Sequence, residues 1–246
     1  MHRAGIDFIC SPELFGKMPE PQRANRFVPE WFRRLNRKMD GAAPGEEAKL
    51  TIKSCMPVTD VFALGYILPL AFDVTLDISP DRRTITTHVE TDCPITMIEP
   101  HKPGQIGAFD PPFEDAMPMK FINPWRIMVP DGYSVLFTPP LSRPDLPFLP
   151  FSGLVDCDRF ATNVNIPFVW KGETGRHTVA AGTPIAHCVP VLRDAIIKEH
   201  VARAATPQEM DDQAAANQRK YGEQGAYTRV GAPGSKCSTC CVRQAV

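Results

Sequence analysis

No apolar run in the 246-residue sequence approaches the roughly 18 residues that a membrane-spanning helix needs. The first residues carry an acid, Asp7, and have no long apolar core, so they do not have the pattern of a secretory leader. The formal net charge is −1, so neither nucleic acid nor an anionic membrane is expected as a partner. We therefore expect a soluble protein of the cytoplasm.

Several widespread catalytic signatures are also missing. The sequence has no P-loop, no Gly-x-Gly-x-x-Gly dinucleotide motif and no Gly-x-Ser-x-Gly nucleophile elbow. His88, His101, His177 and His187 lie far apart in the chain, so only the fold could bring them together around an iron ion. These absences argue against P-loop hydrolases, dinucleotide-dependent dehydrogenases and α/β-hydrolases.

Proline is abundant, with 26 residues, and hydrophobic residues make up 43% of the chain. A proline inside a helix removes an amide donor and clashes with the preceding turn, whereas short strands joined by rigid loops tolerate it. The composition therefore predicts a globular, mainly β protein. Five of the eight cysteines stand singly and are interpreted as reduced, buried thiols.

The pattern along the chain divides it into three parts. Residues 1–48 form an N-terminal extension with short helices after Ser11 and Pro29, and its basic run at 33–38 is interpreted as a solvated helix face. Residues 49–193 form a β domain. Residues 194–246 form two helices, over 194–205 and 207–221, and a glycine- and cysteine-containing flexible tail. Thr206 and Glu209 predict a capping box for the second helix.

Strand signals fill the central part. Residues 73–78 alternate polar and apolar side chains and residues 84–90 are β-branched, which together predict a hairpin. Residues 99–118 are proline-rich and predict a long loop. A turn is expected at 130–132. Further strands are expected over 6–10, 125–129, 133–137, 152–156, 163–170 and 184–192.

One group of motifs carries a resemblance. The run GLVDCDRF at 153–160 is followed by the strand at 163–170 and then by TVAAGTPIAHC at 178–188. This order and spacing is similar to the third and fourth motifs of the trimeric dUTPase and dCTP deaminase group. The resemblance covers residues 125–193 and implies a β-clip-like, double-sheet barrel. The runs KSCMPV at 53–58, NPW at 123–125 and PPLSRPDLPF at 139–148 carry a second resemblance. Through them the chain, over most of its length, looks like an uncharacterised group of bacterial and tailed-phage proteins.

The resemblance assigns roles to residues of the third motif. The resemblance places Asp156 at the mouth of a β-hairpin whose free main-chain groups would read a base edge. Asp156 would activate water, Asp158 would contact the substrate, Phe160 would pack against a sugar and Asn165 would contact a base. Mg²⁺ would be held by the phosphates of a nucleotide. The alternative for Asp156 and Asp158 is a strand-end turn with solvated carboxylates. His187 stands where the family has glutamine and is interpreted as a packing residue.

The other family motifs are altered. At the first motif Tyr66 is kept, but Ile67 replaces the family's acid. At the second motif Ser142 is kept and the arginine is displaced to Arg143, which either contacts phosphate or lies on the surface. Arg229 begins a tail similar to the family's glycine-rich fifth motif, whose amides wrap phosphates.

The last cysteines, Cys237, Cys240 and Cys241, have a spacing suited to zinc or copper, but a fourth ligand is missing nearby. A reduced, unstructured tail, a redox role and a contact between molecules remain the alternatives.

Two functions follow from the resemblance. The first is a dUTPase-like nucleotide hydrolase or nucleotide-binding protein that uses Asp156. The second is a non-catalytic structural or binding protein of phage or mobile-element origin that kept the scaffold. The resemblance implies a homotrimer in either case, because subunit pairing covers sheet edges.

Overall fold

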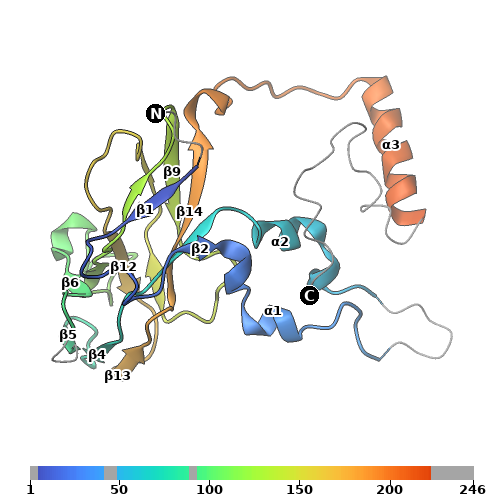
Figure 1. The fold of residues 1–246 in the computed structure, drawn as a ribbon. Helices are drawn as coiled ribbons and strands as arrows, with labels where there is room; N and C mark the ends of the chain where they lie inside the picture. The colour runs from blue at the N-terminus through green and yellow to red at the C-terminus, as the bar shows by residue number, and fades with distance from the viewer. Residues whose placement is uncertain (1–4, 42–48, 89–92, 223–246) are drawn as a thin grey trace.

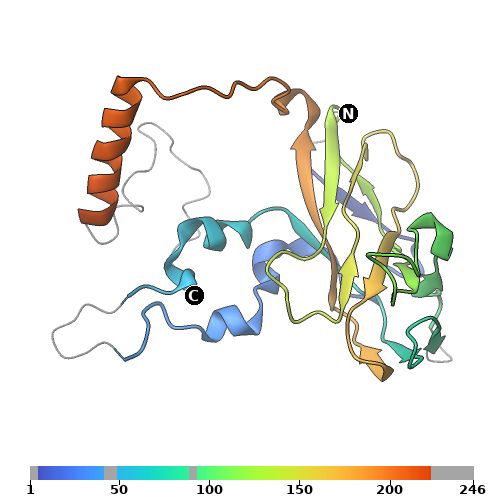
Figure 2. The same cartoon turned by 180° about the vertical axis from the view of Figure 1, so that it is seen from behind.

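The computed structural model describes residues 5–41, 49–88 and 93–222. A mainly β body carries short helices on one side, and the helix α3 (Pro207–Gly222) stands at the end of an extended segment (Figure 1). The view from behind shows the same separation between α3 and the sheets (Figure 2). Among the described residues, no helix has the length and apolar character needed to cross a membrane.

The strands of the body are short. Their bounds are β1 (Asp7–Ile9), β2 (Gln22–Arg23), β3 (Tyr66–Pro69), β4 (Val74–Ile78), β5 (Ile85–His88), β6 (Ile98–Pro100), β7 (Pro118–Phe121), β8 (Arg126–Met128), β9 (Tyr133–Thr138), β10 (Phe148–Pro150), β11 (Gly153–Val155), β12 (Ile166–Trp170), β13 (Gly175–Val179) and β14 (Pro184–Leu192). The short helices are α1 (Glu30–Arg34) and α2 (Met56–Val61), with 3-10 turns at Ala24–Phe27, Ile52–Ser54, Pro103–Gln105 and Arg193–Ala195.

The strands form four antiparallel sheets. The largest has the order β11-β9-β14-β3-β2, and the second has the order β10-β12-β7-β6. A three-stranded sheet β13-β4-β5 and a two-stranded sheet β1-β8 complete the body. Over the ranges given above these sheets stay open, so the closed barrel expected from the sequence is not formed. The N-terminal segment belongs to the body, because β1 pairs with β8 and β2 pairs with β3.

The core follows from alternation in the strands. In β4, Val74, Leu76 and Ile78 are buried while the two residues between them are partly exposed. This strand pairs with β5 in the predicted hairpin. On the neighbouring strands β7 and β12, the buried rings of Phe121 and Phe168 stack with their centroids 4.0 Å apart. Burial of these apolar faces is the main force that holds the sheets together.

The structure corrects two predicted helices. After Ser11 the chain makes only a turn, in which the amides of Leu14 and Phe15 donate to the Ser11 carbonyl. Residues 196–206 are extended instead of helical, because all of them are exposed and find no core to pack against. The helix after Pro29 forms but ends at Arg34.

The predicted cap of α3 is confirmed. The Glu209 amide donates to the Thr206 hydroxyl oxygen at 3.3 Å, and the Thr206 amide donates to the Glu209 carboxylate at 2.8 Å. The turn at 130–132 is also confirmed, since the Tyr133 amide donates to the Pro130 carbonyl. The sequence patterns missed the strands β2, β3, β6, β7, β10 and β13, which are short or carry glycine and proline; β6 and the start of β7 fall at the two ends of the predicted loop 99–118.

Candidate functional site

The predicted catalytic carboxylate lies at one end of the largest sheet. β11 pairs with β9 so that Val155 lies opposite Val135, and β14 pairs with β9 so that Leu192 lies opposite Tyr133. The ends of β11 and β14 therefore meet the start of β9. This register brings Asp156 beside Ser134 and Arg193.

Asp156 is engaged through one of its oxygens. The Ser134 hydroxyl donates to Asp156 Oδ1 at 2.6 Å, and Arg193 Nη1 lies 3.3 Å from the same atom. The Asp156 side chain is still 52% exposed. It is an accessible carboxylate whose Oδ1 already faces a hydroxyl donor and a cation.

Asp158 is held more firmly than Asp156. Its side chain is only 3% exposed, and its two oxygens receive both terminal nitrogens of Arg193, at 2.5 and 3.0 Å. The Gly132 amide donates to Asp158 Oδ2 at 3.0 Å. The hydrogen bonds from Arg193 lower the pKa of Asp158 to about 2, against the opposing effect of desolvation. Asp158 therefore stays ionised and bound to Arg193 at neutral pH.

Arg193 connects this group to the main chain as well. Its Nη1 donates to the Tyr133 carbonyl at 2.8 Å, and its amide donates to the Gly132 carbonyl at 3.0 Å. The bond with Asp158 raises the pKa of Arg193. We call Gly132, Ser134, Asp156, Asp158 and Arg193 the acid–arginine clamp.

Sequence reasoning found the acids of the clamp but missed Ser134 and Arg193. These two residues are separated from each other by 59 positions and become neighbours only through the β9–β14 register. A lone arginine directly after the last strand was the only available signal in the sequence.

The hairpin expected after Asp156 is absent. β11 pairs with β9, whereas β12 lies between β10 and β7 in another sheet. Asp156 instead begins a tight turn, in which the amides of Arg159 and Phe160 donate to its carbonyl at 2.9 Å. Because the two strands join different sheets, the main-chain groups proposed to read a base do not line a common hairpin.

The remaining residues assigned by the third motif lie near this turn but face different surroundings. Phe160 is 44% exposed. Asn165 accepts a hydrogen bond at 3.3 Å from the amide of Asn123, which is itself buried. The buried Asn123 side chain also bonds the main chain of Trp125 and Val164. Asn165 thus takes part in bracing the loop, which is a structural role.

The residues of the altered first and second motifs lie elsewhere. Ser142 and Arg143 follow the end of β9, while Asp156 adjoins its start, so one chain does not bring them together. The Ser142 carbonyl accepts from Trp31 Nε1 at 3.3 Å. Arg143 binds both carboxylate oxygens of Asp145 and lowers the pKa of that carboxyl. Arg143 is therefore already neutralised by its neighbour.

Tyr66 is part of the packing of β3. Its ring meets Phe8 edge to face at 5.6 Å between centroids, and the Arg23 guanidinium lies 5.8 Å from its ring centre. Its neighbour Gly65 adopts φ of +65°, where a Cβ would lie 2.3 Å from the Cys188 carbonyl oxygen. The Gly-Tyr pair that resembles the first motif therefore has a packing role. Gly65 allows the chain before β3 to approach the backbone of β14 closely.

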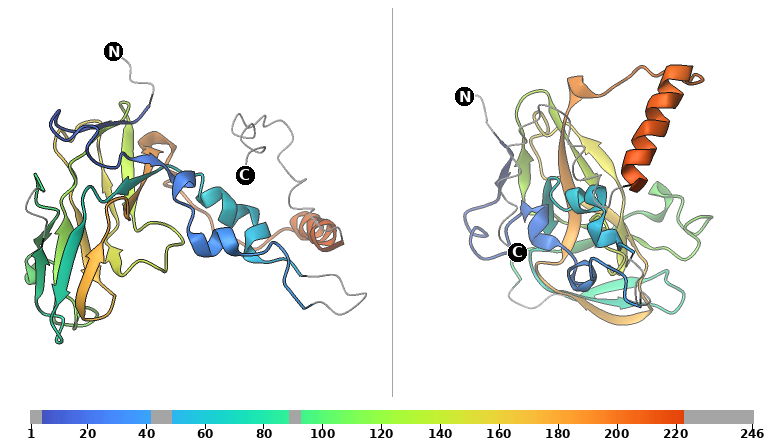
Figure 3. Two further views of the ribbon diagram at one scale, coloured as in Figure 1. Left: turned by 60° about the horizontal axis from the view of Figure 1, so that its bottom comes forward. Right: turned by 90° about the vertical axis from the view of Figure 1, so that its right-hand side faces the viewer.

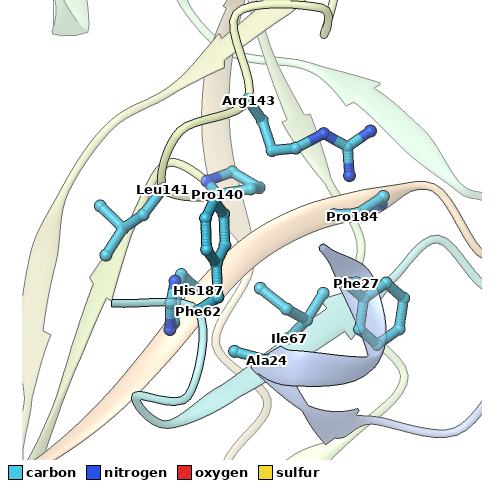
Figure 4. Close-up of a pocket in the computed structure, with 9 residues that line it drawn as sticks. All are labelled: Ala24, Phe27, Phe62, Ile67, Pro140, Leu141, Arg143, Pro184 and His187. Atoms are coloured by element: carbon cyan, nitrogen blue, oxygen red, sulfur yellow. The ribbon is translucent and has the colours of Figure 1, made fainter. Parts of the chain in front are cut away.

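His187 behaves as the packing residue predicted from the sequence. It is 2% exposed, and its Nε2 bonds the Leu64 carbonyl. It lines a small apolar cavity with Phe62, Leu141 and Arg143, and Figure 4 shows these side chains around it. Burial lowers the pKa of His187. Its Nδ1 has no partner in the described part of the chain.

A second, open groove of about 610 Å³ lies beside β1 and β8. Its walls are Ile9, Cys10, Ser11, Leu14, Ile95, Ile122, Asn123, Pro124, Arg126, Ala161, Thr162 and Asn163. It contains no residue assigned by the resemblance, and Arg126 is its one charged wall residue. Its mixed lining defines no particular ligand.

The cysteines whose spacing suits zinc or copper belong to the C-terminal tail. Arg229, Cys237, Cys240 and Cys241 fall outside the described residues. Within residues 5–41, 49–88 and 93–222, no cluster of three histidine, cysteine, aspartate or glutamate side chains could hold a metal ion. The clamp itself is an ion pair between acids and arginine, which leaves no vacant set of ligands in it.

Comparisons with known proteins add no family. No family model matches the chain, and no curated protein matches it in sequence.

Proposed function

We propose that the chain is a non-catalytic protein that assembles with further copies of itself, built on a β scaffold of the β-clip kind. The observation that carries the proposal is the place of Arg193. It is the cation of the acid–arginine clamp and also the residue from which the C-terminal segment leaves the body.

The contacts of the clamp suit anchoring better than catalysis. A general base needs an oxygen free to accept a proton from water, and a phosphate site needs a cation free to meet the ligand. Here Asp156 Oδ1 accepts from Ser134 and faces Arg193, while Arg193 is occupied by Asp158. Arg193 is thus not free to meet a phosphate, although the second oxygen of Asp156 stays outside these contacts.

Anchoring gives the clamp a purpose in the molecule. Asp158 and the Gly132 carbonyl hold Arg193 on two sides, which fixes the point where β14 ends. Beyond this point lies the arm, which we define as residues 196–206 together with α3. Ile197 is 88% exposed and Val201 is 84% exposed in the arm. Exposed apolar residues on a fixed base support a role in contact with another chain.

The expected assembly is a homotrimer, and its mass can be measured by light scattering after size exclusion. In the full chain, Ile197→Asp with Val201→Asp should convert it to a monomer without changing the thermal unfolding of the body. Phe15→Asp, at a residue 64% exposed on the body, is the control and should leave the assembly intact. A wild-type protein that is monomeric at every concentration overturns the proposal.

Nucleotide hydrolysis is the second candidate, and the exposure of Asp156 favours it. In this alternative the free Oδ2 side of the carboxylate directs water to a phosphate, with Mg²⁺ on the nucleotide. The test mixes the protein with a panel of nucleoside triphosphates and Mg²⁺ and measures pyrophosphate. Release that Asp156→Asn abolishes would favour the hydrolase, and no release together with no thermal shift would leave only the scaffold function.

A further inference from the structure

We propose that the arm of one copy docks on the N-terminal projection of a second copy, where acidic residues of α3 meet a basic run. The projection is defined as residues 29–41 and 49–64, which contain α1 and α2. This inference rests on the proposed function and names the surface that the arm would use.

The arm has few contacts of its own with the body. It is extended from 196 to 206 and carries α3 away from the sheets, as the left view of Figure 3 shows. Its side-chain contacts are local: Arg203 pairs with Glu209, and Gln208 donates to Asp212. Met210 on α3 is 61% exposed. The arm therefore offers apolar side chains that nothing in its own body covers.

The N-terminal projection offers a matching apolar surface. Met39, Leu50 and Ile52 are each about half exposed, at 54%, 51% and 50%. Lys38 and Leu50 form an isolated antiparallel β-bridge. Met39 and Leu50 therefore lie on two adjacent segments of the chain. Large apolar residues grouped in this way on a surface mark a contact site more often than singly scattered ones do.

The projection is held in place on the body. Trp31 Nε1 donates to the Ser142 carbonyl of the body. Within the projection, the tilted rings of Phe32 and Phe62 pack with their centroids 4.6 Å apart. The Lys53 amine donates to the Arg33 carbonyl at 2.6 Å. A surface fixed by such contacts loses little further freedom when a partner binds, which favours binding.

Charge decides which part of the arm meets the projection. The run from 33 to 38 contains four cations and no carboxylate; Arg34 pairs with Glu30, which leaves Arg33, Arg37 and Lys38. The first half of α3 carries Asp211 and Asp212 besides Glu209, which pairs with Arg203, and no cation up to residue 217. Opposite charges steer docking and fix its register, and Glu209 and Asp212, three residues apart, share one face of the helix.

A second copy is the partner that fits. Each copy carries both the acidic arm and the basic projection, so the arm of one copy can meet the projection of the next. The extended segment of residues 196–206 spans up to about 36 Å, which is enough to leave its own body and reach a neighbour. One kind of contact, repeated around an axis, then closes a ring.

The test uses charge reversal in the full chain. Arg37→Glu with Lys38→Glu reverses the projection, and Asp211→Lys with Asp212→Lys reverses α3. All four side chains are exposed, so folding should be unaffected. Sedimentation equilibrium should show that either reversal raises the dissociation constant by about tenfold or more, and that combining both restores it to within about threefold.

The control reverses two exposed lysines on the body, Lys17→Glu with Lys171→Glu, and should leave the dissociation constant unchanged. If the combined reversal fails to restore assembly, or the control weakens it equally, the docking surface is overturned. The proposed function fails separately, when Ile197→Asp with Val201→Asp leaves the assembly intact. Loss of assembly in that variant together with unaffected charge reversals would overturn the docking surface alone.

Discussion

At the scale of single residues, the two neighbouring acids of the clamp have different environments. Asp156 is half exposed, whereas Asp158 is enclosed and receives both nitrogens of the Arg193 fork. A two-point bond between guanidinium and carboxylate is stronger than a single contact, and its strength grows where water is excluded. Asp158 is therefore the acid on which the stability of this end of the sheet depends.

Asp158→Asn should destabilise the fold by about 1–2 kcal/mol at neutral pH, after allowance for screening of the partly exposed arginine. The folded pKa of about 2 lies below the unfolded value of about 3.9, so the contribution is present above pH 4 and is lost as the pH falls towards 2. Urea unfolding at pH 7 and pH 2.5 measures it. Asp194→Asn, at an exposed neighbouring position, should change stability at neither pH.

His187 gives a second pH dependence. Its folded pKa lies below the ordinary value because the ring is buried. Stability from this residue is therefore present above its unfolded pKa of about 6.5 and is lost as the pH falls below it. Wild-type stability should drop between pH 7 and pH 5, and His187→Gln should flatten this slope in thermal unfolding. His101→Gln should keep the wild-type slope; an unchanged slope in both variants would contradict the assignment.

At the scale of elements, the residue before β3, Gly65, lies very close to the backbone of β14. Gly65 precedes β3 at a positive φ, and its Cα faces the Cys188 carbonyl with no room for a Cβ. β14 is the longest strand and pairs with both β3 and β9, so this crossing positions the end of β14 and with it Arg193. A defect at Gly65 would spread through the largest sheet.

Gly65→Ala should cost at least about 2–3 kcal/mol, from the disfavoured backbone conformation and from the clash with the carbonyl. Denaturant unfolding measures the loss. Gly153→Ala is the matched control on β11, since nothing lies within 4 Å of a Cβ there. Equal losses in the two variants would show that the close crossing carries no special cost.

At the scale of the whole molecule, the described chain divides into a packed body and an arm with few contacts. The extended part of the arm, residues 196–206, contains two trypsin sites, Lys198 and Arg203, in exposed backbone. Docked arms should be shielded from protease, and separated arms should not be.

Trypsin should therefore cut the arm slowly in dilute buffer and faster near 1 M salt, where the screening length falls to about 3 Å. Mass spectrometry of the early fragments measures the cleavage at Lys198 and Arg203. The Ile197→Asp, Val201→Asp variant should be cut quickly at both salt concentrations. If salt leaves the rate in the wild-type protein unchanged, charge does not hold the arm.

Local patterns in the sequence predicted much of the fold. The alternation from Val74 to Ile78 identified a half-buried strand, and the turn ending at Gly132 was correct, because both depend on neighbouring residues. The sequence also predicted the cap that Thr206 and Glu209 form at the start of α3. The helix over 194–205 was wrong, because its pattern of apolar residues says nothing of whether a surface exists to pack against.

The candidate site was only half visible. Asp156 and Asp158 stood out because they end a strand, but their partner Arg193 lies 35 residues beyond Asp158 and gave no sign of its role. The hairpin after Asp156 was wrong for the same reason. All strands compete for pairing partners, so the strand with which β11 pairs and the register of that pairing depend on the assembled sheets.

The sequence by itself determined the strands with clear alternation, the turn at 130–132 and the helix cap, since backbone sterics and side-chain alternation act over a few residues. Only the tertiary structure decided that the two acids close on Arg193, that Gly65 admits the Cys188 carbonyl and that the arm leaves the body without a core. These outcomes depend on which distant groups are buried together, and burial is settled by the packing of the whole chain.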